Sequence, residues 1–181
     1  MTLDTLVQSL ISYAQKNPHD ECVSQEIISW IQKHREFAFR RENLEGHITA
    51  SLLVMNHEKT KLLLMKHKKL GLWLQFGGHA DGELDIFSVA LREFHEESGI
   101  TSSPIVFSGI FNVHIHEIPA HKNIASHKHY DILYLATISE DTVFSRQEDE
   151  VDDIRWFEIE GIEKYIGEKR MLAMIEKIKS L

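Results

Sequence analysis

A glycine-rich loop that leads into an amphipathic helix with acids at its end is the feature that most constrains this fold. The segment runs from Gly77 to Ile100 and reads GGHADGELDIFSVALREFHEESGI. Apolar residues recur at helical spacing between Leu84 and Phe94, which predicts a helix from about Asp85 to Ser98, ended by a glycine cap. Such a helix packs between other layers, and we expect its acidic end to emerge at a cleft.

Three glutamates cluster in the last turns of this predicted helix. Glu93, Glu96 and Glu97 stand at positions i, i+3 and i+4, so their side chains share one face within an arc of roughly 100°. Like charges at this spacing repel, and acids at the C-terminal end of a helix oppose its dipole. A divalent cation removes the repulsion, and Mg²⁺ uses oxygen ligands to bridge carboxylates and substrate phosphates. The pattern favours a metal site over the alternative, a solvated acidic face.

The same residues resemble the Nudix box, Gly-x5-Glu-x7-Arg-Glu-U-x-Glu-Glu-x-Gly-U, in which U is a bulky aliphatic residue. Its positions are matched by Gly78, Arg92, Glu93, Glu96, Glu97, Gly99 and Ile100, with Phe94 as the bulky apolar residue. The departure is at the first glutamate, where this chain has Leu84 between Glu83 and Asp85. The GGHADG loop is similar to that of a subset of bacterial Nudix hydrolases.

The resemblance implies a fold, a reaction and a cofactor. The fold is an α/β/α sandwich with a mixed β-sheet, here with an N-terminal helical extension. The reaction is metal-dependent hydrolysis of a diphosphate linkage in a nucleoside diphosphate derivative or a related small molecule. The cofactor is Mg²⁺, with Mn²⁺ as an alternative. Expected metal ligands are the three box glutamates and a backbone carbonyl of Gly78, while Arg92 orients a glutamate and one glutamate takes the proton of water.

A second acidic segment follows later in the chain. Glu148 and Glu150 precede the apolar stretch Ile154–Phe157, and members of the family often recruit a further acid from such a loop. Either residue is a candidate metal ligand or base, and the alternative is an ordinary solvated acidic loop.

Twelve histidines is a high number for 181 residues. His114 and His116 are two apart on a predicted strand and share a face, as do His127 and His129 if their strand starts early. The alternatives are a pocket for phosphate or base, a transition-metal site, and an ordinary polar face. The residues expected to line the substrate cleft are His79, Asp81, His114, His116, His129 and Asp131.

The rest of the chain predicts two helices followed by alternating strands and helices. The N-terminal helices comprise Leu3–Lys16 and a second helix capped by Ser24. The expected strands are Ile48–Met55, Leu62–Met65, Ile105–Ile115, Tyr130–Ile138 and Asp153–Ile159, before a terminal helix from Gly161 to Leu181. We therefore expect a helical extension over residues 1–40, packed on a Nudix domain over residues 41–181.

Composition excludes several classes of protein. The net charge of −8 disfavours stable nucleic-acid binding, and no apolar run approaches the roughly 20 residues of a membrane span. The start of the chain lacks the pattern of a signal peptide, and the single Cys22 suits a reducing compartment, so we expect a cytoplasmic protein. A homodimer is left open.

Two other functions compete with hydrolysis. A Nudix-fold module that senses a nucleotide without turning it over commonly loses box acids, and Leu84 keeps this alternative open. An enzyme similar to isopentenyl-diphosphate isomerase needs a cysteine near its site. Cys22 lies in the helical N-terminal segment and the box retains its acids, so the isomerase is the weaker alternative.

Overall fold

The computed structural model describes residues 2–101, 105–121, 124–147 and 149–180. Its helices are α1 (Leu3–Lys16), α2 (Glu21–His34), α3 (Ile86–Ser98) and α4 (Lys169–Lys179). Its strands are β1 (Gly46–Asn56), β2 (Lys61–His67), β3 (Trp73–Leu74), β4 (Phe76–His79), β5 (Val106–Ile118), β6 (His127–Ile138) and β7 (Val151–Glu158). The short strands β3 and β4 were not predicted, and β6 begins at His127 rather than at Tyr130, whereas the other elements correspond to predicted ones, most of them with shifted bounds.

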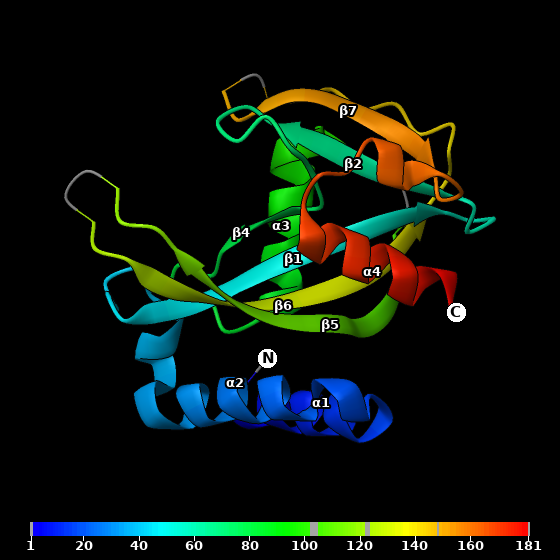
Figure 1. Cartoon of the computed structure of the whole chain (residues 1–181). Coiled ribbons are helices and arrows are strands. Elements are labelled where there is room, and N and C mark those ends of the chain that lie inside the picture. The colour runs from blue at the N-terminus through cyan, green and yellow to red at the C-terminus, as the bar shows by residue number, and fades with distance from the viewer. Residues whose placement is uncertain (1, 102–104, 122–123, 148, 181) are drawn as a thin grey trace. The chain divides into compact units, whose positions relative to one another are not determined.

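The described strands form one sheet of order β3-β2-β1-β6-β5, in which β4 also pairs with β1 and β7 with β2 (Figure 1). The expected α/β class, with a mixed sheet and N-terminal helices, is confirmed. Residue contacts divide the chain into two compact units. Unit 1 comprises Met1–Ser51, Gly77–Ala90 and Gly109–Tyr134, and unit 2 comprises Leu52–Phe76, Leu91–Ser108 and Leu135–Leu181.

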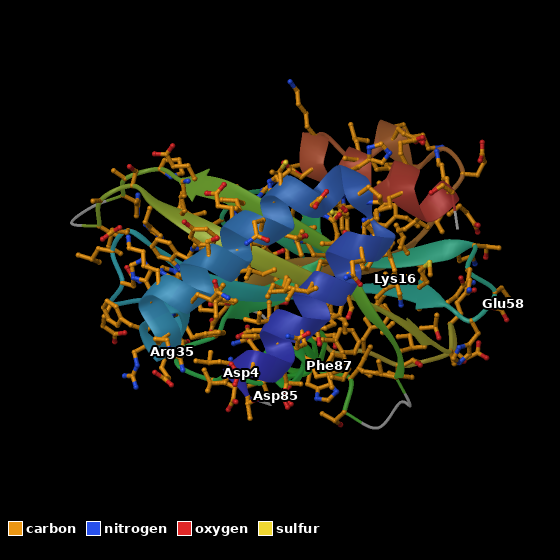
Figure 2. The ribbon with its side chains drawn as sticks, turned by 90° about the horizontal axis from the view of Figure 1, so that it is seen from below. Asp4, Lys16, Arg35, Glu58, Asp85 and Phe87 are labelled. Atoms are coloured by element: carbon orange, nitrogen blue, oxygen red, sulfur yellow. The ribbon has the colours of Figure 1, made fainter. Side chains whose placement is uncertain are left out.

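In unit 1, α1 and α2 lie side by side (Figure 2) and α2 packs on β6. The Trp30 ring of α2 stacks on Tyr130 with centroids 4.6 Å apart, and Lys128 Nζ lies 3.0 Å from a Glu26 carboxylate oxygen. The fully buried apolar residues of the two helices recur at helical spacing: Leu6, Leu10, Ile27 and Ile31. The N-terminal helices therefore contribute to the hydrophobic core of this unit.

The predicted cap of α2 is wrong. The helix begins at Glu21, and Ser24 is buried inside it, where its hydroxyl donates to the Asp20 carbonyl at 2.8 Å. A 3-10 turn over Pro18–Asp20 starts the winding earlier, because proline fixes φ near the helical value.

The terminal helix, in contrast, starts later than predicted. Gly161 adopts φ +75° and is followed by a 3-10 turn over Ile162–Lys164. The helix α4 begins at Lys169, where the Glu168 carboxylate caps it by accepting from the Met171 amide at 2.8 Å. The apolar spacing that predicted one long helix is shared between these two shorter elements.

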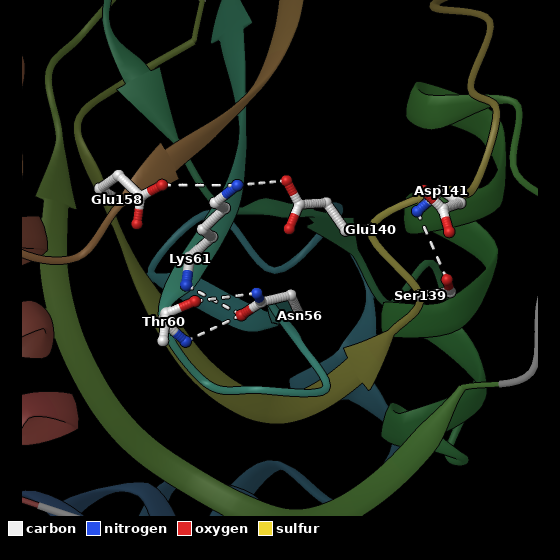
Figure 3. A network of polar contacts seen from close by, with 7 residues as sticks. All are labelled: Asn56, Thr60, Lys61, Ser139, Glu140, Asp141 and Glu158. Carbon is white, nitrogen blue, oxygen red and sulfur yellow. Dashed lines mark hydrogen bonds and ion pairs between the residues drawn. The ribbon is translucent and has the colours of Figure 1, made fainter.

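In unit 2, the predicted hairpin between β1 and β2 is confirmed, with Val54 opposite Leu63. Asn56 closes its turn, because its buried side-chain oxygen accepts from the amides of Thr60 and Lys61 at 2.8 and 2.9 Å (Figure 3). The Lys61 ammonium then contacts the carboxylates of Glu140 and Glu158.

Across the described parts of the chain, none of the helices combines the length and the apolar character needed to cross a membrane.

Candidate active site

The acidic end of α3 lies in unit 2, and Arg92 ties two of its glutamates together. Arg92 Nη1 is 2.8 Å from Glu93 Oε1 and 3.6 Å from Glu96 Oε2. Arg92 thus contacts a box glutamate as expected, but through one nitrogen shared by two glutamates rather than by a bidentate salt bridge to one. One guanidinium nitrogen offsets part of the repulsion that the spacing of these acids creates.

The box glutamates differ in burial. Glu97 is 4% exposed, and the side chains of Glu93 and Glu96 are 15% and 53% exposed. Burial raises the pKa of Glu93, Arg92 opposes this, and the charges of Glu96 and Glu150 add to the increase. Glu150 therefore belongs to the electrostatic environment of Glu93, as expected for an acid from the later loop.

The later loop is fixed to the end of α3 by backbone hydrogen bonds. The Ser145 amide donates to the Ser98 carbonyl at 2.9 Å, and the Gln147 amide donates to the Glu97 carbonyl at 3.2 Å. Gly99 makes this approach possible, because a Cβ there would lie 2.1 Å from the Ser145 carbonyl oxygen. The Glu150 carbonyl accepts from the Lys68 amide at 2.9 Å, and Glu148 lies outside the described residues.

The glycine-rich loop and the start of α3 lie in unit 1. The Glu83 carboxylate accepts from the Asp85 amide at 2.9 Å, and the Asp85 carboxylate accepts from the Ser88 amide at 3.3 Å. The two acids that flank Leu84 thus hold the loop and the first turn of the helix. Gly78 lies in β4 next to Gly77, whose missing Cβ allows contact with the backbone of β1: a Cβ would lie 2.5 Å from the Ala50 carbonyl oxygen.

A cluster of histidine rings also lies in unit 1. Ring centroids of His47 lie 5.1, 5.0 and 4.9 Å from those of His79, His127 and His129. His116 joins the cluster through His129, at 5.3 Å.

Burial keeps the inner rings of this cluster uncharged. It is the largest cause that lowers the pKa of His129 to about 2, that of His79 to about 4, and that of His47 below its ordinary value. Neighbouring histidines lower the pKa of His129 further, and the Arg41 guanidinium is the next largest cause that lowers the pKa of His79. Near pH 7 these three side chains are therefore neutral imidazoles, which offer lone pairs rather than positive charge.

The other predicted cleft residues of unit 1 have partners within the protein. Asp131 is buried and accepts from Thr49 Oγ1 at 2.8 Å and Ser51 Oγ at 2.9 Å. Asp81 pairs with Arg41, with Oδ2 2.7 Å from Nη2. The rings of His114 and His116 stack at 5.5 Å, which confirms that these two residues share a face.

The structure therefore brings His79, His116 and His129 together, and it adds two histidines that the predicted site omitted. His127 stands two residues before His129 on β6, so its position on the same face was readable from the sequence. His47 was missed because only the pairing of β1 with β6 places it there, and no spacing in the sequence signals that pairing.

Comparison with known proteins identifies the family. The model of the NUDIX domain matches residues 46–177, more than half of the chain, so the chain belongs to the Nudix family. A curated relative from Lactococcus lactis subsp. cremoris, described as "Probable DHNTP pyrophosphohydrolase", is 29% identical over 120 residues. That alignment covers 65% of this chain and 66% of the relative, just under two thirds of its length.

Solved structures agree with this fold. A NUDIX-family hydrolase from Clostridium perfringens has 22% identity and a TM-score of 0.56 over 74% of this chain and 96% of that one. An Ap4A hydrolase of C. elegans, solved as a binary complex, has 19% identity and a TM-score of 0.59 over 74% of this chain and 95% of that one. At these identities the likeness establishes the fold alone.

Proposed function

We propose that this chain is a divalent-cation-dependent pyrophosphohydrolase. Its substrate is a nucleoside diphosphate derivative or a related small molecule with linked phosphates. The observation that carries the proposal is the set of three glutamates on one turn of α3. Arg92 contacts Glu93 and Glu96, and the charge of Glu150 acts on Glu93. Membership of the Nudix family supports the reaction class. The relatives named for DHNTP and Ap4A support a small phosphate-bearing substrate.

The carboxylates fit a divalent cation. Burial raises the pKa of Glu93, and Glu97 is nearly inaccessible to solvent, so the ionised forms of these acids gain from a nearby positive charge. Their oxygen donors suit Mg²⁺ or Mn²⁺. We assign Glu93, Glu96, Glu97 and Glu150 as ligands, with Gly78 and Glu148 as further predicted ones. When bound, the cation supplies charge neutralisation at the phosphates and lowers the pKa of water.

The residues of the chain divide the remaining work. Arg92 positions Glu93 and Glu96, and one of the box glutamates accepts the proton of the attacking water. The water oxygen forms a bond to one phosphorus, the bond from that phosphorus to the bridging oxygen breaks, and the leaving group takes the electron pair. The reaction needs no covalent intermediate with the protein.

We propose that residues of unit 1 contact the substrate. His79, His114, His116 and His129 supply flat rings suited to a base or a sugar. Asp81 contributes to substrate binding by positioning Arg41, and Asp131 does so by positioning the hydroxyls of Thr49 and Ser51.

Replacing Glu97 tests the proposal. Glu97→Gln keeps the shape of the side chain and removes its charge. We expect turnover to fall by at least about 100-fold, because mutating even a residue that only supports a metal ligand lowers metal affinity or activity by 10–100-fold. The assay is Mg²⁺-dependent hydrolysis of a panel of diphosphate compounds, with the products identified. The control is Glu176→Gln, which changes an exposed glutamate on α4 and leaves activity unchanged.

Two results would contradict the proposal. Wild-type activity in the Glu97→Gln variant would show that the assigned residues are not the active site. Tight nucleotide binding by the wild-type protein without any turnover would favour the sensing module, for which Leu84 in place of the first box glutamate is the relevant observation.

A further inference from the structure

Three histidines from neighbouring strands of unit 1 present ring nitrogens to one another. One nitrogen from each of His47, His127 and His129 lies within 4.8 Å of the other two. His47 belongs to β1, and the other two are alternate residues of β6, so the pairing of these two strands gathers them (Figure 1). This arrangement is independent of the acidic end of α3.

Two of the rings direct one nitrogen to a backbone carbonyl. His47 Nδ1 lies 3.4 Å from the Asn43 carbonyl oxygen, and His127 Nδ1 lies 3.0 Å from the Ala125 carbonyl oxygen. A carbonyl oxygen only accepts, so Nδ1 carries the hydrogen in both rings and Nε2 keeps its lone pair. Histidines that bind metals commonly donate their second ring nitrogen to a carbonyl in this way.

Two ring nitrogens of the cluster have no hydrogen-bond partner among the described residues. His47 is 3% exposed, and the Nε2 atoms of His47 and His129 are both buried without a hydrogen-bond partner there. An unsatisfied buried polar atom costs roughly 1–3 kcal/mol. A ligand that accepts electron pairs would remove this cost at both positions.

We propose that His47, His127 and His129 bind a divalent transition-metal ion of the zinc class. Imidazole nitrogens suit Zn²⁺, Ni²⁺ and Cu²⁺, whereas Mg²⁺ prefers oxygen ligands. A tetrahedral ion with bonds of about 2.0–2.1 Å needs ligand nitrogens about 3.4 Å apart, so the three nitrogens, which lie within 4.8 Å of one another, move closer on binding. Three protein ligands leave a fourth position for water or a small ligand.

The surroundings of the cluster favour a metal over an anion. Phosphate needs several hydrogen-bond donors, whereas His47 and His127 each direct one ring nitrogen to a backbone carbonyl and have no second N–H to offer in their neutral forms. His127 and His129 are only half-buried, whereas His47 is buried, so the cluster is reached from the β6 side.

A titration with Co²⁺ tests the site directly. Untagged protein is freed of metal with a chelator and titrated with Co²⁺, which gives visible absorption bands in a tetrahedral nitrogen site. We expect one equivalent to bind, one equivalent of Zn²⁺ to displace it, and excess Mg²⁺ to leave it bound. His127→Ala removes the most accessible ligand and is expected to weaken binding more than about 100-fold, with its fold checked by circular dichroism.

Three control variants locate the ion. His19→Ala changes an exposed histidine of the N-terminal segment and should leave the Co²⁺ spectrum unchanged. His114→Ala should also leave it unchanged, which excludes the stacked pair of β5 as the binding site. Glu97→Gln should retain the spectrum while losing hydrolysis, so the two proposals succeed or fail separately.

The inference is overturned by any of three results. The first is a wild-type protein that gives no tetrahedral Co²⁺ spectrum. The second is a folded His127→Ala variant that binds as tightly as the wild type. The third is loss of the spectrum in Glu97→Gln or His114→Ala, which would place the ion elsewhere.

Discussion

The contact of Gly99 with the later loop gives the sharpest prediction. Gly99 adopts φ +68°, and a Cβ there would lie 2.1 Å from the carbonyl oxygen, 2.4 Å from the hydroxyl and 3.0 Å from the carbonyl carbon of Ser145. The hydroxyl can rotate away, whereas the backbone atoms cannot move unless the loop moves. Gly99→Ala therefore has a conformational cost and a steric cost.

Gly161 separates the two costs. It adopts φ +75°, and no atom lies within 4 Å of its ideal Cβ position, so Gly161→Ala has the conformational cost of roughly 1–2 kcal/mol alone. Both variants reduce the entropy of the unfolded chain equally. Forcing a methyl group into a packed contact costs typically about 1–3 kcal/mol. We expect Gly99→Ala to be less stable than Gly161→Ala by about 2 kcal/mol, or about 4–8 °C in Tm for a chain of this size.

Thermal unfolding followed by circular dichroism measures the difference. Because the amides of Ser145 and Gln147 bond to the end of α3, movement of the loop also disturbs Glu97, so Gly99→Ala should lose more hydrolytic activity than Gly161→Ala. Equal Tm values for the two variants would refute the steric argument. A stable Gly99→Ala variant with full activity would show that the loop has no role in positioning the acids.

Two further predictions concern Glu93 and Asn56. Burial raises the pKa of Glu93 above its ordinary value of 4.5, so its protonated form stabilises the fold below pH 4.5, and that contribution is lost as pH rises through the raised pKa. With a chelator present, the Tm of Glu93→Gln should therefore rise relative to that of the wild type as the pH increases from 4 to 7. Mg²⁺ should raise the Tm of the wild type and not that of the variant. A difference in Tm between the two proteins that stays constant across this pH range would contradict the assignment. Asn56→Ala should lower the free energy of unfolding by about 1–3 kcal/mol in urea, because two amides of the β1–β2 turn lose their acceptor. Thr60→Val removes only the side-chain hydrogen bond to Asn56 and should lower the free energy of unfolding by less. A larger decrease in Thr60→Val than in Asn56→Ala would contradict this explanation.

Local patterns in the sequence predicted most of the elements. The helix Leu3–Lys16 matches its predicted bounds, because apolar spacing and a break at Asn17-Pro18 are both local signals. The predicted starts of α2 and α4 were wrong, because a 3-10 turn precedes each helix and shares its apolar spacing.

The candidate acidic site was predictable for a related reason. Glu93, Glu96 and Glu97 belong to one helical turn, so their spacing alone places them on one face. The influence of Glu150 on Glu93 required the structure, since it depends on a loop whose backbone bonds to the end of α3.

What the sequence by itself determined is therefore local: the helix that carries the acids, the glycines that flank it and the alternation along each strand. The helical and strand periods convert spacing directly into a shared face. Only the tertiary structure decided that His47 meets His127 and His129, because the order of strands in a sheet follows from how the whole core packs. Burial, and with it the neutral state of His47 and His129, was decided at the same level.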